Sequence, residues 1–175
     1  MTGLAGSMRW NKYILGLFVA GIMSILLPPL CPAQEKKPAI MIKADDFEGA
    51  IFPEGFRWFV PVKNASAWTP EKKDIVLAEG LVKDFLKHHE PDNAYYRECV
   101  PKILNALSRY KRQYAGFIDK NGEKNVFINF FIPASHIVDW DKRMVFVCDG
   151  GFHYFRITVN LSRKQCFDLS INGVA

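Results

Sequence analysis

The sequence predicts an α+β domain in which one long amphipathic helix packs on an antiparallel sheet. Three observations lead to this prediction. An apolar stripe with helical spacing runs through residues 69–88, stretches rich in aromatic and β-branched residues follow from Tyr110 onward, and an Asn121-Gly122 turn joins the first two of these stretches. The predicted sheet is a meander of four to five strands, and a second, shorter helix precedes it.

The first 33 residues have the layout of a secretion signal. Arg9 and Lys12 supply its positive charge, an apolar run spans residues 14–27, and Cys31 and Ala33 are small residues at the −3 and −1 positions of a cleavage site. We therefore expect export to the periplasm or the extracellular space, with cleavage after Ala33.

Two other interpretations of residues 1–33 stay open. The apolar run has about 14 residues, whereas a membrane anchor needs roughly 20. Cys31 could instead carry a lipid, although Pro29 and Leu30 before it are not the small residues that such a signal uses. Membrane attachment is thus expected only through an uncleaved signal or a lipidated Cys31.

Removal of the signal changes what the composition implies. The signal holds 2 of the 23 basic residues and none of the 18 acidic residues, so the chain that remains after cleavage has a formal charge of +3. Such a small excess does not favour nucleic acid as a partner. Three cysteines remain, and an odd number does not suit a disulfide framework, so the core must stabilise the domain.

The first elements are expected between residues 34 and 62. Residues 34–50 are polar and have no period, so we expect a linker there and one domain over residues 51–175. The stretch from Phe56 to Val62 is aromatic and β-branched with Pro61 inside it, which is typical of an edge strand.

The long helix is predicted to end near His88. Thr69 can cap it, Pro70 suits its first position, and Glu71 complements the positive end of the helix dipole. The apolar stripe comprises Ile75, Ala78, Val82 and Phe85, flanked by Leu77, Leu81 and Leu86. The polar face comprises Lys72, Lys73, Asp74, Glu79, Lys83 and Asp84.

A second helix is predicted within residues 94–108, where Pro101 leaves its internal boundary open. Strands are expected at residues 110–119, 125–133, 144–149, 152–161 and 165–171. Their registers follow from requiring one apolar face across the sheet, with tight turns at Gly150-Gly151 and at residues 162–164. The pairs that result are Cys148 with His153, Phe146 with Phe155, Met144 with Ile157, Val159 with Phe167, Ile157 with Leu169, and Phe155 with Ile171. The same registers place Cys148 and Cys166 too far apart for a disulfide.

Cys148 opposite His153 is one candidate for chemistry, because an imidazole can activate a thiol as a nucleophile. No carboxylate that would orient the histidine accompanies the pair. The same pattern arises if Cys148 and His153 simply lie at the end of the apolar face, with Cys148 as a small hydrophobic side chain.

An alternation of aromatic and basic residues from Tyr110 to Tyr114 is the second candidate. On a strand, Tyr110, Arg112 and Tyr114 would share one face, which could bind an anionic ligand. Tyr154 and Arg156 would extend such a binding surface. An amphipathic strand with a partly buried arginine stem is the more ordinary explanation of the alternation.

Metal ligands and cofactors are not expected. Adjacent histidines on a helix point about 100° apart and cannot chelate from one face, and the acidic loop residues fit a solvated loop. The residues considered are His88, His89, Glu90, His136, Asp139 and Asp141. The chain also has no phosphate-binding loop, no dinucleotide fingerprint and no serine nucleophile elbow.

Three stretches near the C-terminus stand out together, at residues 110–116, 149–155 and 170–175. Their spacing resembles that of a family of small exported bacterial proteins without an assigned activity. The order of predicted elements also resembles the cystatin-like and NTF2-like architectures. These resemblances imply an exported α+β domain and no particular chemistry.

Together these observations favour a non-enzymatic exported domain that binds a protein or a small ligand through its sheet or loops. One alternative is an NTF2-like enzyme with a site in a concave sheet, which a pocket combining His136 or His153 with a carboxylate would favour. Another alternative is a structural envelope component that an uncleaved signal holds at the membrane.

Overall fold

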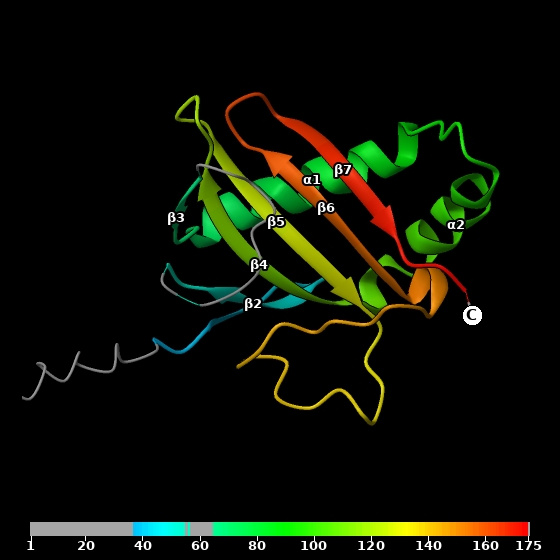
Figure 1. Cartoon of the computed structure of the whole chain (residues 1–175), viewed down its shortest axis with the longest axis horizontal. Helices are drawn as coiled ribbons and strands as arrows, with labels where there is room; N and C mark the ends of the chain where they lie inside the picture. Colours follow the sequence, from blue (N-terminus) through cyan, green and yellow to red (C-terminus); the bar gives the residue numbers. More distant parts are fainter. Residues whose placement is uncertain (1–36, 55, 57–64, 175) are drawn as a thin grey trace, which may run out of the picture. The chain divides into compact units, whose positions relative to one another are not determined.

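The computed structural model describes residues 37–54, 56 and 65–174. The described strands form one mixed sheet in the order β1-β2-β4-β5-β6-β7, and β3 pairs with the end of β4. Helix α1 crosses one face of this sheet, and α2 lies near its β6–β7 end (Figure 1). The elements are β1 (Ile40–Lys43), β2 (Glu48–Phe52), β3 (Ser66–Trp68), α1 (Lys72–His88), α2 (Ala94–Asn105), β4 (Lys111–Ile118), β5 (Lys124–Phe131), β6 (Tyr154–Asn160) and β7 (Gln165–Ile171).

The predicted α+β class is confirmed, with two helices and a mostly antiparallel sheet, but the strands number seven in the described part of the chain rather than four to five. The additional strands come from the N-terminal side. Residues 40–52, most of which fall in the expected linker, form β1 and β2. They are held by burial of Ile42, Phe47 and Ile51 and by parallel pairing of β2 with β4. The signal at residues 1–33 and nearly all of the strand predicted at residues 56–62 lie outside the described residues.

Helix α1 ends at His88 as predicted but begins two residues later than Pro70 suggests. Its N-cap is Glu71, whose backbone N–H donates to Asp74 Oδ2 at 2.9 Å. The expected cap Thr69 has another role, because its Oγ1 accepts a hydrogen bond from the Glu54 backbone N–H at 2.9 Å. The hydroxyl thus ties the residues after β2 to the start of the helix.

Helix α2 is capped by Asn93, whose Oδ1 accepts from the Tyr95 backbone N–H at 2.8 Å. The helix continues through Pro101, and a short 3₁₀ turn at Leu107–Arg109 then leads into β4. The boundary that Pro101 left open therefore falls after Asn105.

The hairpin of β4 and β5 around Gly122, which has φ +77°, follows the prediction from Asn121-Gly122. The next hairpin does not form, because β6 pairs with β5 and residues 144–149 are not a strand. The β5–β6 register places Ile128 beside Ile157 and Phe130 beside Phe155, which gives a longer shared apolar face than residues 144–149 could offer. Hence the predicted pairs of Cys148 with His153, Phe146 with Phe155, and Met144 with Ile157 are wrong.

The predicted register between β6 and β7 is correct at one end of the strand pair only. Phe155 pairs with Ile171 as predicted, but Val159 pairs with Cys166 instead of Phe167. Asp168, with φ +55°, lies at the irregularity that shifts the register by one residue. As a result Cys166 packs against the core and Phe167 is 39 % exposed, the reverse of the expected faces.

The core lies between α1 and the sheet. The helix contributes a buried stripe, and the ring of Phe130 stacks on Phe155 with centroids 4.2 Å apart. The buried helix residues are Ile75, Ala78, Glu79, Val82 and Leu86. Glu79, expected on the polar face, is therefore an inward-facing acid.

Residues 132–150, the connection between β5 and β6, contact the opposite face of the sheet at Gln113 of β4 and Asn129 of β5. Gln113 on β4 is fully buried and holds this connection with both ends of its amide. Its Nε2 donates to Trp140 O at 2.6 Å and to Arg143 O at 2.8 Å, and its Oε1 accepts from the Val145 backbone N–H at 2.8 Å and from Asn129 Nδ2 at 3.0 Å. The connection is irregular yet anchored.

Lys164, in the turn between β6 and β7, offers a test of this backbone. Its φ of +55° is unfavourable for a side chain with a Cβ, so Lys164→Gly is expected to raise the free energy of unfolding by about 0.5–1 kcal/mol. Urea denaturation of the two proteins measures the change. Lys120→Gly is the matched control, because Lys120 has no positive φ and should gain nothing; an equal gain at both lysines would contradict the strain argument.

Candidate functional site

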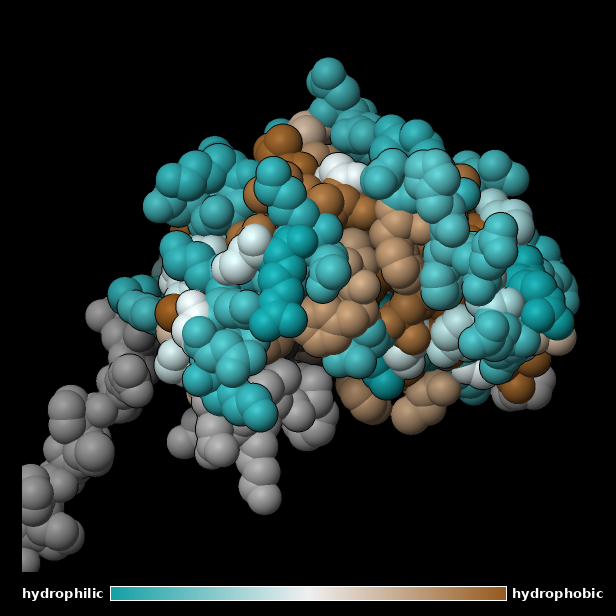
Figure 2. Space-filling view, turned by 90° about the horizontal axis from the view of Figure 1, so that it is seen from above, coloured by the Kyte–Doolittle hydropathy of each residue, from teal (hydrophilic) through white to brown (hydrophobic). Residues whose placement is uncertain are grey.

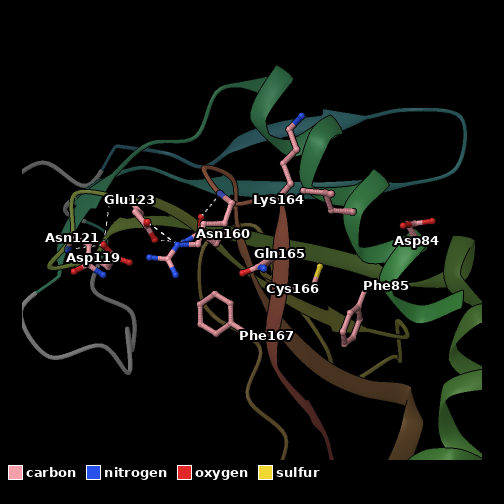
Figure 3. Close-up of a pocket in the computed structure, with 12 residues that line it drawn as sticks. Asp84, Phe85, Asp119, Asn121, Glu123, Asn160, Lys164, Gln165, Cys166 and Phe167 are labelled. Atoms are coloured by element: carbon pink, nitrogen blue, oxygen red, sulfur yellow. Dashed lines mark hydrogen bonds and ion pairs between the residues drawn. The ribbon is translucent and has the colours of Figure 1, made fainter. Parts of the chain in front are cut away.

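A groove of about 590 Å³ lies between α1 and β7. The turn after β4 stands at one end of the groove, and Asp84 and Phe85 of α1 stand at the other (Figure 3). The residues that line it are Leu81, Asp84, Phe85, Asp119, Asn121, Glu123, Asn160, Arg163, Lys164, Gln165, Cys166 and Phe167.

The floor of this groove is apolar because α1 carries a wider apolar face than the sheet covers. Leu81 and Phe85 line the groove, and Leu77, four residues before Leu81, continues the same side of the helix beyond it. The sheet ends at β7, so Leu77 stays 40 % exposed while Leu81 and Phe85 are half-buried. Figure 2 looks onto this side of the domain and shows hydrophobic residues exposed in the middle of a hydrophilic surround.

The rim consists of two turns that are tied to each other. Glu123 accepts hydrogen bonds from Asn160 Nδ2 at 2.8 Å and from Arg163 Nε at 2.7 Å. Asp119 Oδ1 accepts from the backbone N–H groups of Asn121 and Glu123, and the hydrogen bond from Glu123 is the main reason why the pKa of Asp119 is lowered. The rim is therefore a preformed polar frame around an apolar floor.

Cys166 belongs to the floor rather than to any reactive centre. It is half-buried, and burial raises the pKa of its thiol to about 12. At neutral pH the thiol keeps its proton and behaves as a small apolar group. Cys99 is buried and Cys148 is exposed, and all three are free cysteines.

The five residues expected to bind a ligand do not share one surface. Tyr110, Arg112 and Tyr114 share a face of β4 as predicted, but that face is the buried one, beneath α1. Tyr110 donates its hydroxyl to Phe152 O at 2.6 Å. Tyr154 and Arg156 lie on β6, where Tyr154 is half-buried and Arg156 is exposed. The alternation was thus correctly assigned to a strand, and the face that these residues share points into the core, as the amphipathic-strand explanation requires.

The other candidates from the sequence are also separated. Cys148 and His153 are both exposed and are not paired across strands. His136 is exposed as well, and Asp139 is paired with Lys142 at 2.9 Å. His88 Nδ1 lies 2.9 Å from Asp84 O, while His89 stacks on Phe85. Within residues 37–54, 56 and 65–174 no cluster of histidine, cysteine and acidic residues is arranged to hold a metal ion.

None of the helices in the described part of the chain has both the length and the apolarity needed to span a membrane. Comparisons of the chain with protein-family models, with characterised proteins and with solved structures found no match. The groove was not identified in the sequence, because its residues come from one helix, two turns and an edge strand. The extra apolar flank of Leu77 and Leu81 was the signal that could have indicated it.

Proposed function

We propose that the chain is an exported, non-enzymatic binding module that takes up an extended peptide segment of another protein alongside β7. The observation that carries this proposal is an edge strand next to an uncovered apolar stripe of α1. A peptide added as a strand would lie about 4.8 Å beyond β7. Alternate side chains of that strand would then cover Leu77, Leu81 and Phe85.

The free part of the β7 edge is short. Beyond the bulge at Asp168, the Ile171 backbone N–H already donates to the Tyr96 hydroxyl at 3.1 Å. The stretch from Gln165 to Phe167 stands beside the groove. We therefore propose recognition of a few residues of extended backbone, with one or two apolar side chains in the groove.

The rim fits a peptide better than a small apolar molecule. Beside the frame formed by Asp119, Glu123 and Arg163, Asp84 offers an acceptor and Lys164 offers a donor to the groove. Both signs of charge are present, which suits the paired N–H and C=O groups of a peptide backbone. The proposal also includes export by the N-terminal segment. It further includes a cystatin-like or NTF2-like relationship, which the packing of α1 across β4–β7 supports.

Two exposed phenylalanines allow a matched test. A displayed library of random peptides of about ten residues is selected on the full chain, and the enriched peptides are titrated against variants. We expect Phe167→Lys, in the groove, to weaken binding at least about tenfold, and Phe146→Lys, in the 132–150 connection and 75 % exposed, to leave it unchanged. Lack of enrichment, or equal loss in both variants, would contradict the proposal.

A further inference from the structure

A second pocket, of about 450 Å³, shares no lining residue with the groove. Its walls are the turn between β1 and β2, one side of α1, the end of α2, and the residues that lead from α2 into β4. Its lining residues are Asp46, Phe47, Val76, Glu79, Gly80, Lys83, Leu104, Asn105, Leu107, Ser108 and Arg112. A volume of this size accommodates a small molecule.

A buried carboxylate that is only half satisfied lines this pocket. Glu79 is 8 % exposed, and its Oε1 accepts the Tyr114 hydroxyl at 2.8 Å and lies 3.4 Å from Arg112 Nε. Oε2 accepts no hydrogen bond from the described residues. Among the described residues, the side-chain polar atoms that are shielded from solvent and lack a hydrogen-bond partner are Arg112 Nε and Asn125 Oδ1. Because Oε2 is not one of these atoms, it is not shielded from solvent. Oε2 is therefore an open acceptor, and burial raises the pKa of Glu79.

Arg112 is 1 % exposed and is already committed to its own chain. Its Nη1 donates to Tyr110 O and its Nη2 donates to Leu107 O at 3.0 Å. The guanidinium carbon lies 5.7 Å from the ring centroid of Phe47 and 5.3 Å from that of Phe130. The guanidinium is almost fully buried and already faces Glu79 and two backbone carbonyls, whereas Oε2 of Glu79 has no hydrogen-bond donor among the described residues.

The walls of the pocket suit an aliphatic chain. Phe47, Val76, Leu104 and Leu107 supply apolar surface. Apart from Arg112, the cationic residue that lines the pocket is Lys83, which is paired with Asp46 at 3.6 Å. Gly80 stands in the middle of α1, where glycine destabilises a helix relative to alanine. No atom lies within 4 Å of a Cβ built on it, so the missing side chain leaves the pocket open.

We propose that this pocket binds a small aliphatic amine, with Glu79 accepting hydrogen bonds from the ammonium group and the apolar walls covering the chain. The site goes beyond peptide capture and does not depend on the groove. Binding at one location can therefore fail without affecting the other.

The probe is n-hexylammonium, titrated into the full chain while the backbone amide resonances of Gly80, Asn105 and Ser108 are followed. We expect saturable shifts with hexylammonium and none with hexanoate at equal concentration. Glu79→Gln should weaken binding at least about tenfold, because it removes the charge and keeps the acceptor for Tyr114. Glu90→Gln, an exposed acid outside the pocket, should leave the affinity unchanged.

A second variant covers the case in which Glu79→Gln does not fold. Gly80→Leu adds a side chain to the open space and should abolish binding while raising the melting temperature, since leucine favours a helix. Hexanoate binding in preference to hexylammonium would overturn the proposal. So would full affinity in Glu79→Gln or in Gly80→Leu.

Discussion

Replacing Arg112 by methionine is expected to lower the free energy of unfolding by about 3–5 kcal/mol at neutral pH. Methionine fills part of the space between Phe47 and Phe130 but leaves the Glu79 carboxylate without a cation 3.4 Å away. Both side chains are almost fully buried, so solvent screens the remaining charge only weakly. Urea denaturation of wild type and variant measures the loss.

The double variant Arg112→Met/Glu79→Gln separates charge from packing. It removes both charges and keeps an acceptor for the Tyr114 hydroxyl, so it should recover most of the lost stability. If the double variant is as unstable as Arg112→Met, the loss comes from the packing and backbone contacts of the arginine. The buried charge would then not be its cause.

The pH dependence gives the same interaction an independent signature. Burial raises the pKa of Glu79 in the folded protein above its ordinary value of 4.5, despite Arg112 and Tyr114, which act in the opposite direction. The folded state thus keeps this proton longer than the unfolded state does, and stability falls as the pH rises from about 4.5 through the folded pKa. Lys83 and Asp46 are the other charged groups at this pocket. Arg112→Met should therefore cost less near pH 4, where Glu79 is mostly neutral, than near pH 7.

The second large effect is expected at Gln113, where Gln113→Leu should free the 132–150 connection from the sheet. Leucine has a similar volume, but it leaves four polar groups of the connection and of Asn129 without their partner. Three of these hydrogen bonds reach the connection. At about 1 kcal/mol for each, the anchoring weakens by roughly 3 kcal/mol, which is a factor of about 100 in local opening.

Limited digestion with trypsin reports this opening directly, because Lys142 and Arg143 lie in the connection. We expect cleavage there to become about 100 times faster in Gln113→Leu under conditions where opening is fast and reversible. Gln165→Leu, at an exposed glutamine of β7, is the control and should be cut at the wild-type rate. An unchanged rate in Gln113→Leu would mean that other contacts hold the connection.

The sequence predicted best those elements whose signals are local. The stripe of α1 repeats every three or four residues, and Asn121-Gly122 specifies its own turn, so the helix and the β4–β5 hairpin were found. The pairing of β6 with β5 was missed because it joins strands across the 132–150 connection, while Gly150-Gly151 offered a shorter alternative. Both glycines do have positive φ, but they start a 3₁₀ turn at Gly151–His153 instead of a hairpin.

The sites were harder to predict than the fold because charge was taken as a sign of exposure. Alternation correctly placed Arg112 between Tyr110 and Tyr114 on one face of a strand, and an arginine is ordinarily on the solvent side. Its partner Glu79 stands on a helix turn whose neighbours are Lys83 and Asp84, so it too was assigned to solvent. Only the three-dimensional packing of α1 on β4 shows that the two charges meet inside.

The parallel pairing of β2 with β4 also constrains how the chain can fold. Glu48 and its partner Lys111 are about 60 residues apart, and both helices lie between them. Synthesis proceeds from the N-terminus, so β1 and β2 emerge well before the strand that they join. Until β4 arrives, this short apolar hairpin has no sheet to complete, and its apolar residues stay exposed to contacts with other chains.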